Sequence, residues 1–190
     1  NFPIYLRKDL KLSSIYYPYT KELHLDICEQ INSKEVVVGE LTGHFFNLKV
    51  LNKDKKRDEL ISLLNYYNEE TFDICKSLIL ETSCLKNQGK NIYHLDRFYI
   101  HPEYRGTGVG RLILDEFIKN SSNYIEDNIM YIGLFPDPIT DNIEFDSKED
   151  MNRVEREVMV KHLKSFYSTF GFKEMKTNPE YMYLDLNKAN

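Results

Sequence analysis

The sequence predicts a mixed α/β fold in which helices cover both faces of a mostly antiparallel sheet. Two observations support this prediction. Residues 22–29 alternate apolar and polar side chains, as expected of a strand buried on one face. Residues 58–85 place apolar side chains three and four positions apart, as expected of an amphipathic helix. Both patterns return along the chain without a linker, repeat or low-complexity segment, so we expect one domain over residues 1–190.

The N-terminal region is expected to form an antiparallel hairpin. Residues 1–21 are aromatic and irregular, and we interpret them as a packed arm or a short strand. The strand at 22–29 is followed by a turn at 32–34 and by a run at 36–50 that is extended and β-branched at its start. Gly43 lies inside that run and is expected to mark a β-bulge.

The middle of the chain is expected to alternate helices with a central strand. The helical segment 58–85 is expected to break near residues 68–71, and a polar turn follows at 87–91. Residues 92–100 form an apolar extended run, which predicts the central strand, and residues 109–119 show helical periodicity. The buried face of that helix is expected to consist of Val109, Leu112, Ile113 and Phe117.

The C-terminal region is expected to complete the sheet. A strand at 129–135 ends at two prolines, and an acidic loop at 137–150 is expected beside the functional site. A helix at 151–170 is followed by a hairpin of residues 172–175 and 181–186. The core stripe of the helix is expected to be Val154, Val158, Leu163, Phe166 and Phe170.

Composition places limits on partners and location. The 190 residues carry a net charge of −5 and lack a dense run of Lys and Arg, so we expect no nucleic-acid partner. No apolar run approaches the roughly 20 residues of a membrane span, so we expect no membrane contact. The 3 cysteines are widely spaced, which favours reduced thiols and a cytoplasmic protein. An exposed strand edge leaves a homodimer possible.

The run Arg105–Arg111 contains Gly106, Gly108 and Gly110 and lies between the central strand and the following helix. Glycine lets the backbone approach an anion, and the first N–H groups of the helix point at it. The spacing fits neither a Walker A loop, which needs a following lysine, nor the Gly-x-Gly-x-x-Gly dinucleotide fingerprint. The run therefore predicts a phosphate site of another kind.

This run resembles the acyl-CoA loop of the GCN5-related N-acetyltransferases (GNAT), Arg/Gln-x-x-Gly-x-Gly/Ala, through Arg105, Gly108 and Gly110. Residues 98–106 are similar to the strand and loop that precede it in the family. Residues 166–172 resemble the family motif Tyr-x-x-x-Gly-Phe, which places its tyrosine at Tyr167. The resemblance covers roughly residues 92–187.

The resemblance implies the GNAT fold and acetyl-CoA as co-substrate. In the family, loop amides hold the coenzyme pyrophosphate, and strand amides at the positions of Phe98 and Ile100 hold the pantetheine arm. The tyrosine at Tyr167 is implied as the general acid that protonates the leaving thiolate. The coenzyme-binding residues implied in this way are Phe98, Tyr99, Ile100, Arg105, Gly106, Thr107, Gly108, Val109, Gly110 and Arg111.

The general base is less determined. His94 and Asp96 share a face of the central strand if that strand is regular, and Asp96 lies nearer the loop. Asp96 and Arg97 are alternatively a structural ion pair. His44 and Glu40 on the early hairpin are weaker options, and His101 is interpreted as a loop residue.

The chain departs from the family in two respects. Its hairpin comes early, with the long helical segment between the hairpin and the central strand, whereas family members usually place a strand and two helices before the first hairpin. Val160 stands where family members often carry an asparagine that contacts the coenzyme arm.

These observations together favour an enzyme. We expect an acetyl-CoA-dependent N-acetyltransferase that uses no metal and transfers the acetyl group to a primary amine by direct attack. The acceptor is expected to be a small-molecule amine or a protein amine. The alternative is a regulatory or interaction module that binds acyl-CoA without turnover.

Overall fold

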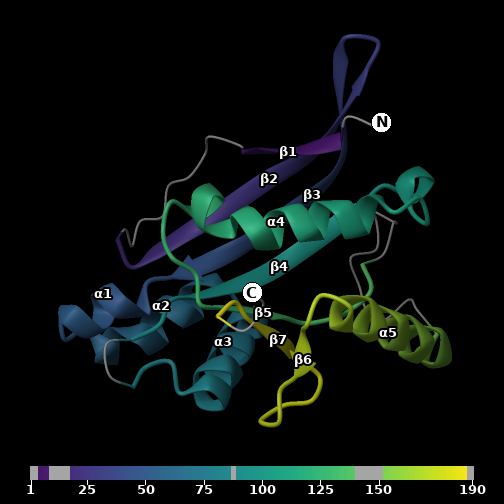
Figure 1. The fold of residues 1–190 in the computed structure, drawn as a ribbon. Helices are drawn as coiled ribbons and strands as arrows, with labels where there is room; N and C mark the ends of the chain where they lie inside the picture. The colour runs from purple at the N-terminus through teal and green to yellow at the C-terminus, as the bar shows by residue number, and fades with distance from the viewer. Residues whose placement is uncertain (1–3, 9–17, 87–88, 140–151, 188–190) are drawn as a thin grey trace.

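The computed structural model describes residues 4–8, 18–86, 89–139 and 152–187. Within them, the strands form one sheet in the order β1-β2-β3-β4-β5-β7-β6 (Figure 1). Neighbouring strands are antiparallel except for the parallel pair β4–β5. The predicted mixed, mostly antiparallel sheet is therefore confirmed. The strands are β1 (Ile4–Lys8), β2 (Thr20–Ile31), β3 (Lys34–Phe46), β4 (Ile92–Ile100), β5 (Tyr131–Leu134), β6 (Lys173–Glu174) and β7 (Met182–Asp185).

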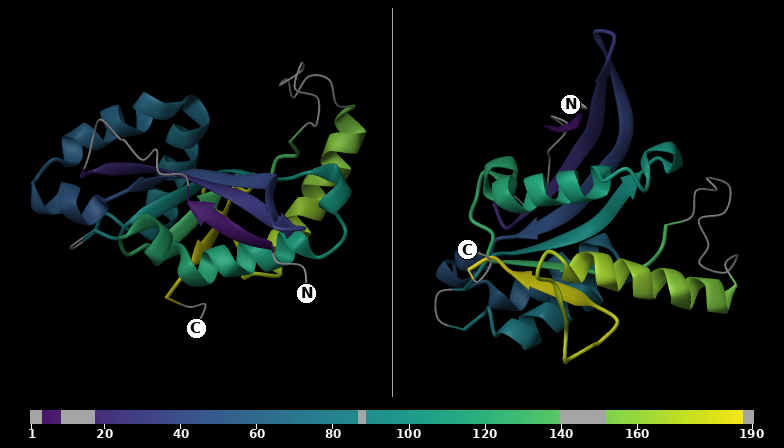
Figure 2. Two further views of the ribbon diagram at one scale, coloured as in Figure 1. Left: turned by 90° about the horizontal axis from the view of Figure 1, so that it is seen from above. Right: turned by 45° about the vertical axis from the view of Figure 1, so that its right-hand side comes forward.

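Helices cover both faces of this sheet, as the sequence predicts (Figures 1 and 2). On one face, α4 and α5 pack over apolar side chains such as Leu25, Tyr93 and Leu95. On the other face, α1, α2 and α3 pack over Ile92 and Tyr131. The helices are α1 (Leu48–Lys53), α2 (Leu60–Tyr67), α3 (Glu69–Thr82), α4 (Val109–Ile125) and α5 (Arg153–Ser168), with 3₁₀ turns at Arg57–Glu59 and Pro102–Tyr104.

The early hairpin of β2 and β3 is confirmed. Asn32 and Ser33 both have positive φ, at 46° and 65°, which is the two-residue hairpin turn that matches the twist of the strands. The tip projects from the body of the molecule (Figure 1). β1 pairs with the outer edge of β2, so part of the N-terminal arm is a strand, and residues 9–17 lie outside the described residues.

Two interruptions of the sheet shape its centre. Leu95 pairs with Gly43 and Arg97 pairs with Thr42, so Asp96 is an extra residue on β4. The bulge expected at Gly43 is thus present, with the extra residue on the partner strand. A Cβ on Gly43 would collide with the His94 carbonyl oxygen and the Tyr93 ring. β4 also pairs with β5 only over Ile92–Leu95, so the two strands part beyond that point.

The run expected to be extended to residue 50 ends instead at Phe46. Asn47 caps α1 there, because its side-chain oxygen accepts a hydrogen bond from the Val50 amide at 3.1 Å. The break expected near residues 68–71 is confirmed at Asn68, whose side chain caps α3 through the Thr71 amide at 2.7 Å. Residues 87–88 and 140–150 of the expected turn and loop lie outside the described residues.

The predicted buried faces of two helices are wrong in part. Leu112 of α4 is 54% exposed, and Val154 and Val158 of α5 are 65% and 50% exposed. Only the C-terminal part of the α5 stripe, Leu163, Phe166 and Phe170, packs on the core. The N-terminal half of α5 projects beyond the strands, which leaves its apolar positions uncovered by the described residues (Figure 1).

Candidate active site

A cavity of about 930 Å³ lies where β4 and β5 part. Its walls are the free side of β4 from Leu95 to Ile100, the residues that follow β5, the glycine loop and the C-terminal half of α5. We call it the cleft. Phe98, Tyr99 and Ile100 all line it, as the sequence predicts for the strand that precedes the loop.

The glycine loop closes one end of the cleft. Gly106 and Gly108 have φ of 74° and 91°, a region that side chains rarely adopt, while open space surrounds both positions. The two glycines are therefore required by the backbone turn. Gly108 is the N-cap of α4 and has no side chain to bond the N–H groups of the first turn. A helix start of this kind attracts anions.

Two arginines flank this loop and face the cleft. Arg105 Nε donates a hydrogen bond to the Ile100 carbonyl at 2.8 Å, and its guanidinium lies 5.3 Å from the centre of the Tyr99 ring. Arg111 lies 5.3 Å from the Phe170 ring. These contacts hold two positive charges beside the start of α4, where a pyrophosphate group would be stabilised.

Thr107, Val109 and Gly110 contact neighbouring parts of the protein. Thr107 turns back, and its hydroxyl donates to the Tyr104 carbonyl at 2.6 Å. Val109 is buried against Ile27 and Val38. Gly110 lines the cleft, and a Cβ there would come within 3.4 Å of the Ile100 side chain.

Tyr167 lies on the α5 wall of the cleft and is 8% exposed. Its ring packs against Phe166 and Phe172, with centroids 5.3 and 5.6 Å away. Burial raises the pKa of Tyr167 above its ordinary value near 10, so the phenol keeps its proton at neutral pH. The hydroxyl is thus available as a proton donor.

Asp96 lines the cleft at the bulge where the strands part. Burial raises the pKa of Asp96, and the nearby Arg97 charge partly opposes that shift. The guanidinium of Arg97 bonds to Glu40 and lies 5.1 Å from the Tyr99 ring. Arg97 therefore has a different carboxylate partner, and the ion-pair interpretation of Asp96 is not favoured.

His94 is on the same face as Asp96 but lies behind it. It is 1% exposed, does not line the cleft, and places Nδ1 3.1 Å from the Thr71 hydroxyl. Burial lowers the pKa of His94 to about 3, with a further contribution from His44. His44 Nε2 lies 3.9 Å from the Asp96 carboxylate, and burial lowers the pKa of His44 to about 4. Both imidazoles are therefore neutral at pH 7.

The residues that the sequence favours less as the general base do not reach the cleft. Glu40 accepts from Arg97 and lies 3.5 Å from His24. His101 is outside the cleft and lies 3.9 Å from Glu103. Val160 does not line the cleft, whereas its neighbours Met159 and His162 do.

Sequence reasoning missed several lining residues. Glu70, at the start of α3, comes from a helix that the sequence did not connect with the site. Its position follows from the contact of the adjacent Thr71 with His94. Asp137 lies just after β5 and is bound by Arg156 of α5. Only the acidic character of the segment after β5 hinted at Asp137.

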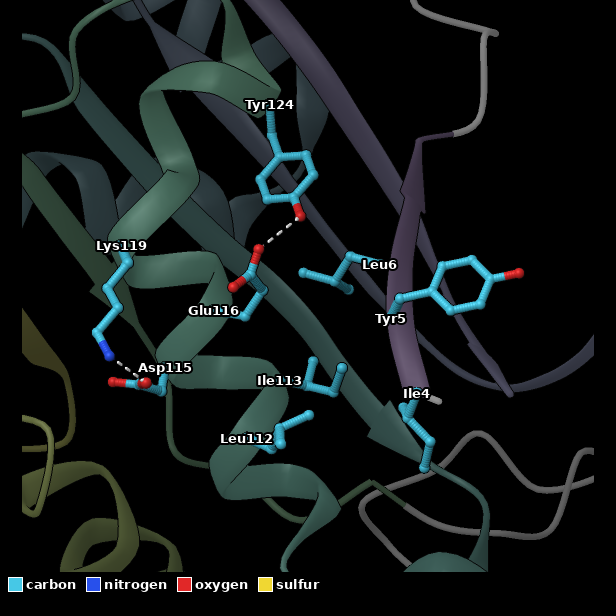
Figure 3. A pocket seen from close by; sticks show the side chains of 9 residues that line it. All are labelled: Ile4, Tyr5, Leu6, Leu112, Ile113, Asp115, Glu116, Lys119 and Tyr124. Atoms are coloured by element: carbon cyan, nitrogen blue, oxygen red, sulfur yellow. Dashed lines mark hydrogen bonds and ion pairs between the residues drawn. The ribbon is translucent and has the colours of Figure 1, made fainter. Parts of the chain in front are cut away.

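A second cavity of about 520 Å³ lies between β1 and α4, and we call it the groove (Figure 3). Four of its polar side chains form two pairs with one another. The Lys119 ammonium donates to Asp115 at 2.6 Å, and the Tyr124 hydroxyl donates to Glu116 at 3.3 Å. The groove includes neither the glycine loop nor Tyr167, so the sequence motifs meet in the cleft.

The structure thus combines a mixed sheet, a short parallel β4–β5 ladder beyond which the two strands part, and a glycine loop at the start of α4. The sequence matches the family model of the "Acetyltransferase (GNAT) domain" over residues 74–174, more than half of the chain. The chain therefore belongs to the GNAT acetyltransferase family, and the resemblance stated from the two motifs is confirmed.

Three solved structures are similar in fold. The KacTA–DNA complex is 10% identical with a TM-score of 0.45, covering 90% of this chain and 71% of that chain. AtaTR bound with acetyl-CoA is 12% identical with a TM-score of 0.44, covering 88% and 69%. NAA60 of Arabidopsis thaliana, in complex with a bisubstrate analogue, is 11% identical with a TM-score of 0.41, covering 85% and 73%. No curated protein matches the sequence.

Similarity at this level says nothing about substrate or partner. One of the three structures contains DNA, whereas the acidic charge of this chain led us to expect no nucleic-acid partner, and the likeness does not decide between these possibilities. Among the described helices, none is long and apolar enough to cross a membrane.

Proposed function

We propose that the chain is an acetyl-CoA-dependent N-acetyltransferase that acts on a primary amine by direct attack. The observation that supports this best is the separation of charge along β4. Arg105 and Arg111 flank the loop after its C-terminal end. Asp96 lies four residues before that end, about 13 Å away along an extended strand. A cleft with this polarity suits an anionic coenzyme at one end and a cationic amine at the other.

In this proposal the loop amides, Arg105 and Arg111 bind the coenzyme pyrophosphate. The β4–β5 ladder ends at Leu95, and we propose that the β4 backbone beyond it, where it lines the cleft, holds the pantetheine arm and the thioester oxygen. Tyr167 faces the same space from α5. Because these groups come from segments between Glu70 and Tyr167, we also propose that the chain works as one domain.

Asp96 is proposed as the general base. It takes a proton from the attacking ammonium, so that the neutral nitrogen forms a bond to the thioester carbon. Tyr167 then donates its proton to the departing sulfur as the carbon–sulfur bond breaks, and the second proton that the nitrogen loses returns to the Tyr167 oxygen. The raised pKa of Asp96 brings this carboxyl closer to neutral pH, which improves a general base. The products are an amide and free coenzyme A.

Glu70 is proposed to help recognise the acceptor. It lines the cleft beside Thr71, which contacts His94 two residues before Asp96. A second carboxylate near Asp96 favours amines that carry positive charge at neutral pH. The amines to test are therefore a polyamine, an aminoglycoside, a peptide with a lysine and a peptide with a free α-amine.

Thiol release from acetyl-CoA, measured with each amine, tests the proposal. We expect release to depend on the amine and to fall about 100-fold in Asp96→Asn, because general base catalysis contributes roughly 10²–10⁴-fold. Asp115→Asn is the matched control, because it makes the same chemical change in the groove. Thermal unfolding should show acetyl-CoA binding in both variants, worth about 2.7 kcal/mol at a hundredfold excess over Kd.

Two other outcomes have distinct meanings. A raised unfolding midpoint with acetyl-CoA but no thiol release from any amine would favour the non-catalytic acyl-CoA-binding module. No rise in the midpoint would contradict the coenzyme site itself.

A further inference from the structure

Three metal-ligating side chains meet behind the cleft. His44 on β3 and His94 on β4 are direct cross-strand partners, with ring centroids 5.9 Å apart. Asp96 follows on the same face at the bulge. One ligand atom from each residue lies within 4.8 Å of the other two. Across the described residues, this is the cluster of His, Cys, Asp and Glu whose geometry suits a metal ion.

The two histidines leave nitrogens unused. His94 Nδ1 contacts the Thr71 hydroxyl at 3.1 Å, while the buried His94 Nε2 has no hydrogen-bond partner among the described residues. His44 Nδ1 is also buried without such a partner. Buried polar atoms are nearly always bonded, so an unpartnered nitrogen on a residue that is 1% exposed needs an explanation.

We propose that His44, His94 and Asp96 form a binding site for one divalent transition metal ion of the zinc type. Two imidazoles and a carboxylate are ligands that zinc accepts, whereas Mg²⁺ and Ca²⁺ prefer oxygen alone. Ligand atoms in a tetrahedral zinc site lie about 2.0–2.2 Å from the ion and so about 3.4 Å apart. The three groups therefore need to close by no more than about 1.5 Å.

Several features of the surroundings favour this assignment. Thr71 fixes the His94 ring through Nδ1, which is the arrangement in which a histidine binds metal through Nε2. Asp96 lines the cleft, which supplies a path for the ion and room for a fourth ligand.

The site has a consequence that rests on the proposed function. An ion that is bound to Asp96 occupies the carboxylate that is proposed to take the proton from the amine. Zinc should therefore inhibit acetyl transfer reversibly, and a chelator should restore it. Metal binding itself requires neither acetyl-CoA nor an amine.

The test measures binding first. Metal-free protein competes with a chromophoric chelator for Zn²⁺, and Co²⁺ is used in parallel because its absorption reports nitrogen and oxygen ligands. We expect one ion per chain, and at least tenfold weaker binding in His44→Ala, His94→Gln and Asp96→Asn. Thr71→Val should weaken binding about tenfold, as changes to groups that orient a ligand do. Mg²⁺ should not compete.

His101→Ala is the matched control, because it removes an exposed imidazole outside the cluster. Circular dichroism and thermal unfolding show whether each variant is folded. Equal zinc affinity in the wild type and in folded His44→Ala and His94→Gln variants would overturn the proposal. So would a wild type that binds no zinc in competition with the chelator.

Measurements of the acetylation rate distinguish a failure of the metal site from a failure of the proposed function. Each variant's rate with zinc is compared with its own metal-free rate. Inhibition of the wild type that is lost in His44→Ala supports a site that acts on Asp96. If no amine is acetylated at all, the proposed function fails while the binding measurement still decides the metal site.

Discussion

The cleft and the groove, of which Figure 3 shows the groove, are both cavities beside α4, but they differ in how their polar groups are satisfied. In the groove, Lys119 pairs with Asp115 and Tyr124 with Glu116 along the same helix. In the cleft, the β4–β5 ladder stops at Leu95 and the first amides of α4 have no side-chain cap. The interrupted ladder and the glycine N-cap, more than cavity size, distinguish the candidate site.

The largest difference between the two hollows should appear when a tyrosine hydroxyl is removed from each. Tyr167→Phe should lower kcat by about 10²–10⁴-fold, because the leaving thiolate loses its proton donor, while coenzyme affinity stays within a factor of about three. Tyr124→Phe, in the groove, should leave kcat unchanged. Steady-state thiol release and isothermal titration with coenzyme A measure the two quantities. Equal kcat in Tyr167→Phe and wild type would remove the general-acid role.

The second-largest difference between the cleft and the groove is expected when a positive charge is removed from each. Arg105→Ala should weaken coenzyme A binding about 10- to 100-fold, since hydrogen bonds to charged groups contribute about 1.5–3 kcal/mol. Lys119→Ala makes the same change of charge in the groove and should change affinity less than twofold. Titration calorimetry at two salt concentrations checks both variants. Parallel losses in both would mean that only net charge attracts the coenzyme.

The buried histidines behind the cleft should make stability depend on pH. Their folded pKa values, about 4 for His44 and about 3 for His94, lie below the ordinary 6.5. The unfolded chain therefore binds more protons below pH 6.5, and stability present above that pH is lost as pH falls toward 4. Each histidine contributes up to about 1.4 kcal/mol per pH unit. Denaturant unfolding of His94→Gln between pH 7 and 5 should show a shallower loss than the wild type does.

The smallest effect is expected in the apolar wall of the groove. Leu112 is 54% exposed, so Leu112→Ser should change the free energy of unfolding by no more than about 0.5 kcal/mol and leave coenzyme binding intact. A loss above about 1.5 kcal/mol in urea unfolding would show that this leucine is covered in solution. The groove would then need to be reconsidered as an interface.

Local sequence signals predicted much of the fold. The limits of β4 agree with residues 92–100, and the break before α3 falls at Asn68, because an alternating or capped segment fixes its own backbone. α1 was missed because the apolar run continues past the end of β3, and only the cap of Asn47 marks the end of the strand. The exposed valines of α5 were mispredicted because periodicity shows which residues share a face, while the extent of the sheet decides whether that face is covered.

The candidate site was predictable where a motif is continuous in sequence. The loop glycines and Tyr167 are of this kind, and the structure brings both to one cleft. Glu70 could not be predicted, because it reaches the cleft through the packing of α3 on β4. The approach of His44 to Asp96 depends on strand register, and the bulge that places Asp96 became visible only once β3 and β4 were paired.

The short β4–β5 ladder gives the molecule an edge strand in the interior of its own sheet. Such edges pair readily with any extended chain, and proteins usually protect them. Here the Arg105 side chain donates a hydrogen bond to the carbonyl of Ile100, the last residue of β4. Amide hydrogen exchange should therefore be faster between Arg97 and Ile100 than between Ile92 and Leu95, and a bound coenzyme arm should slow it in the manner of an added strand.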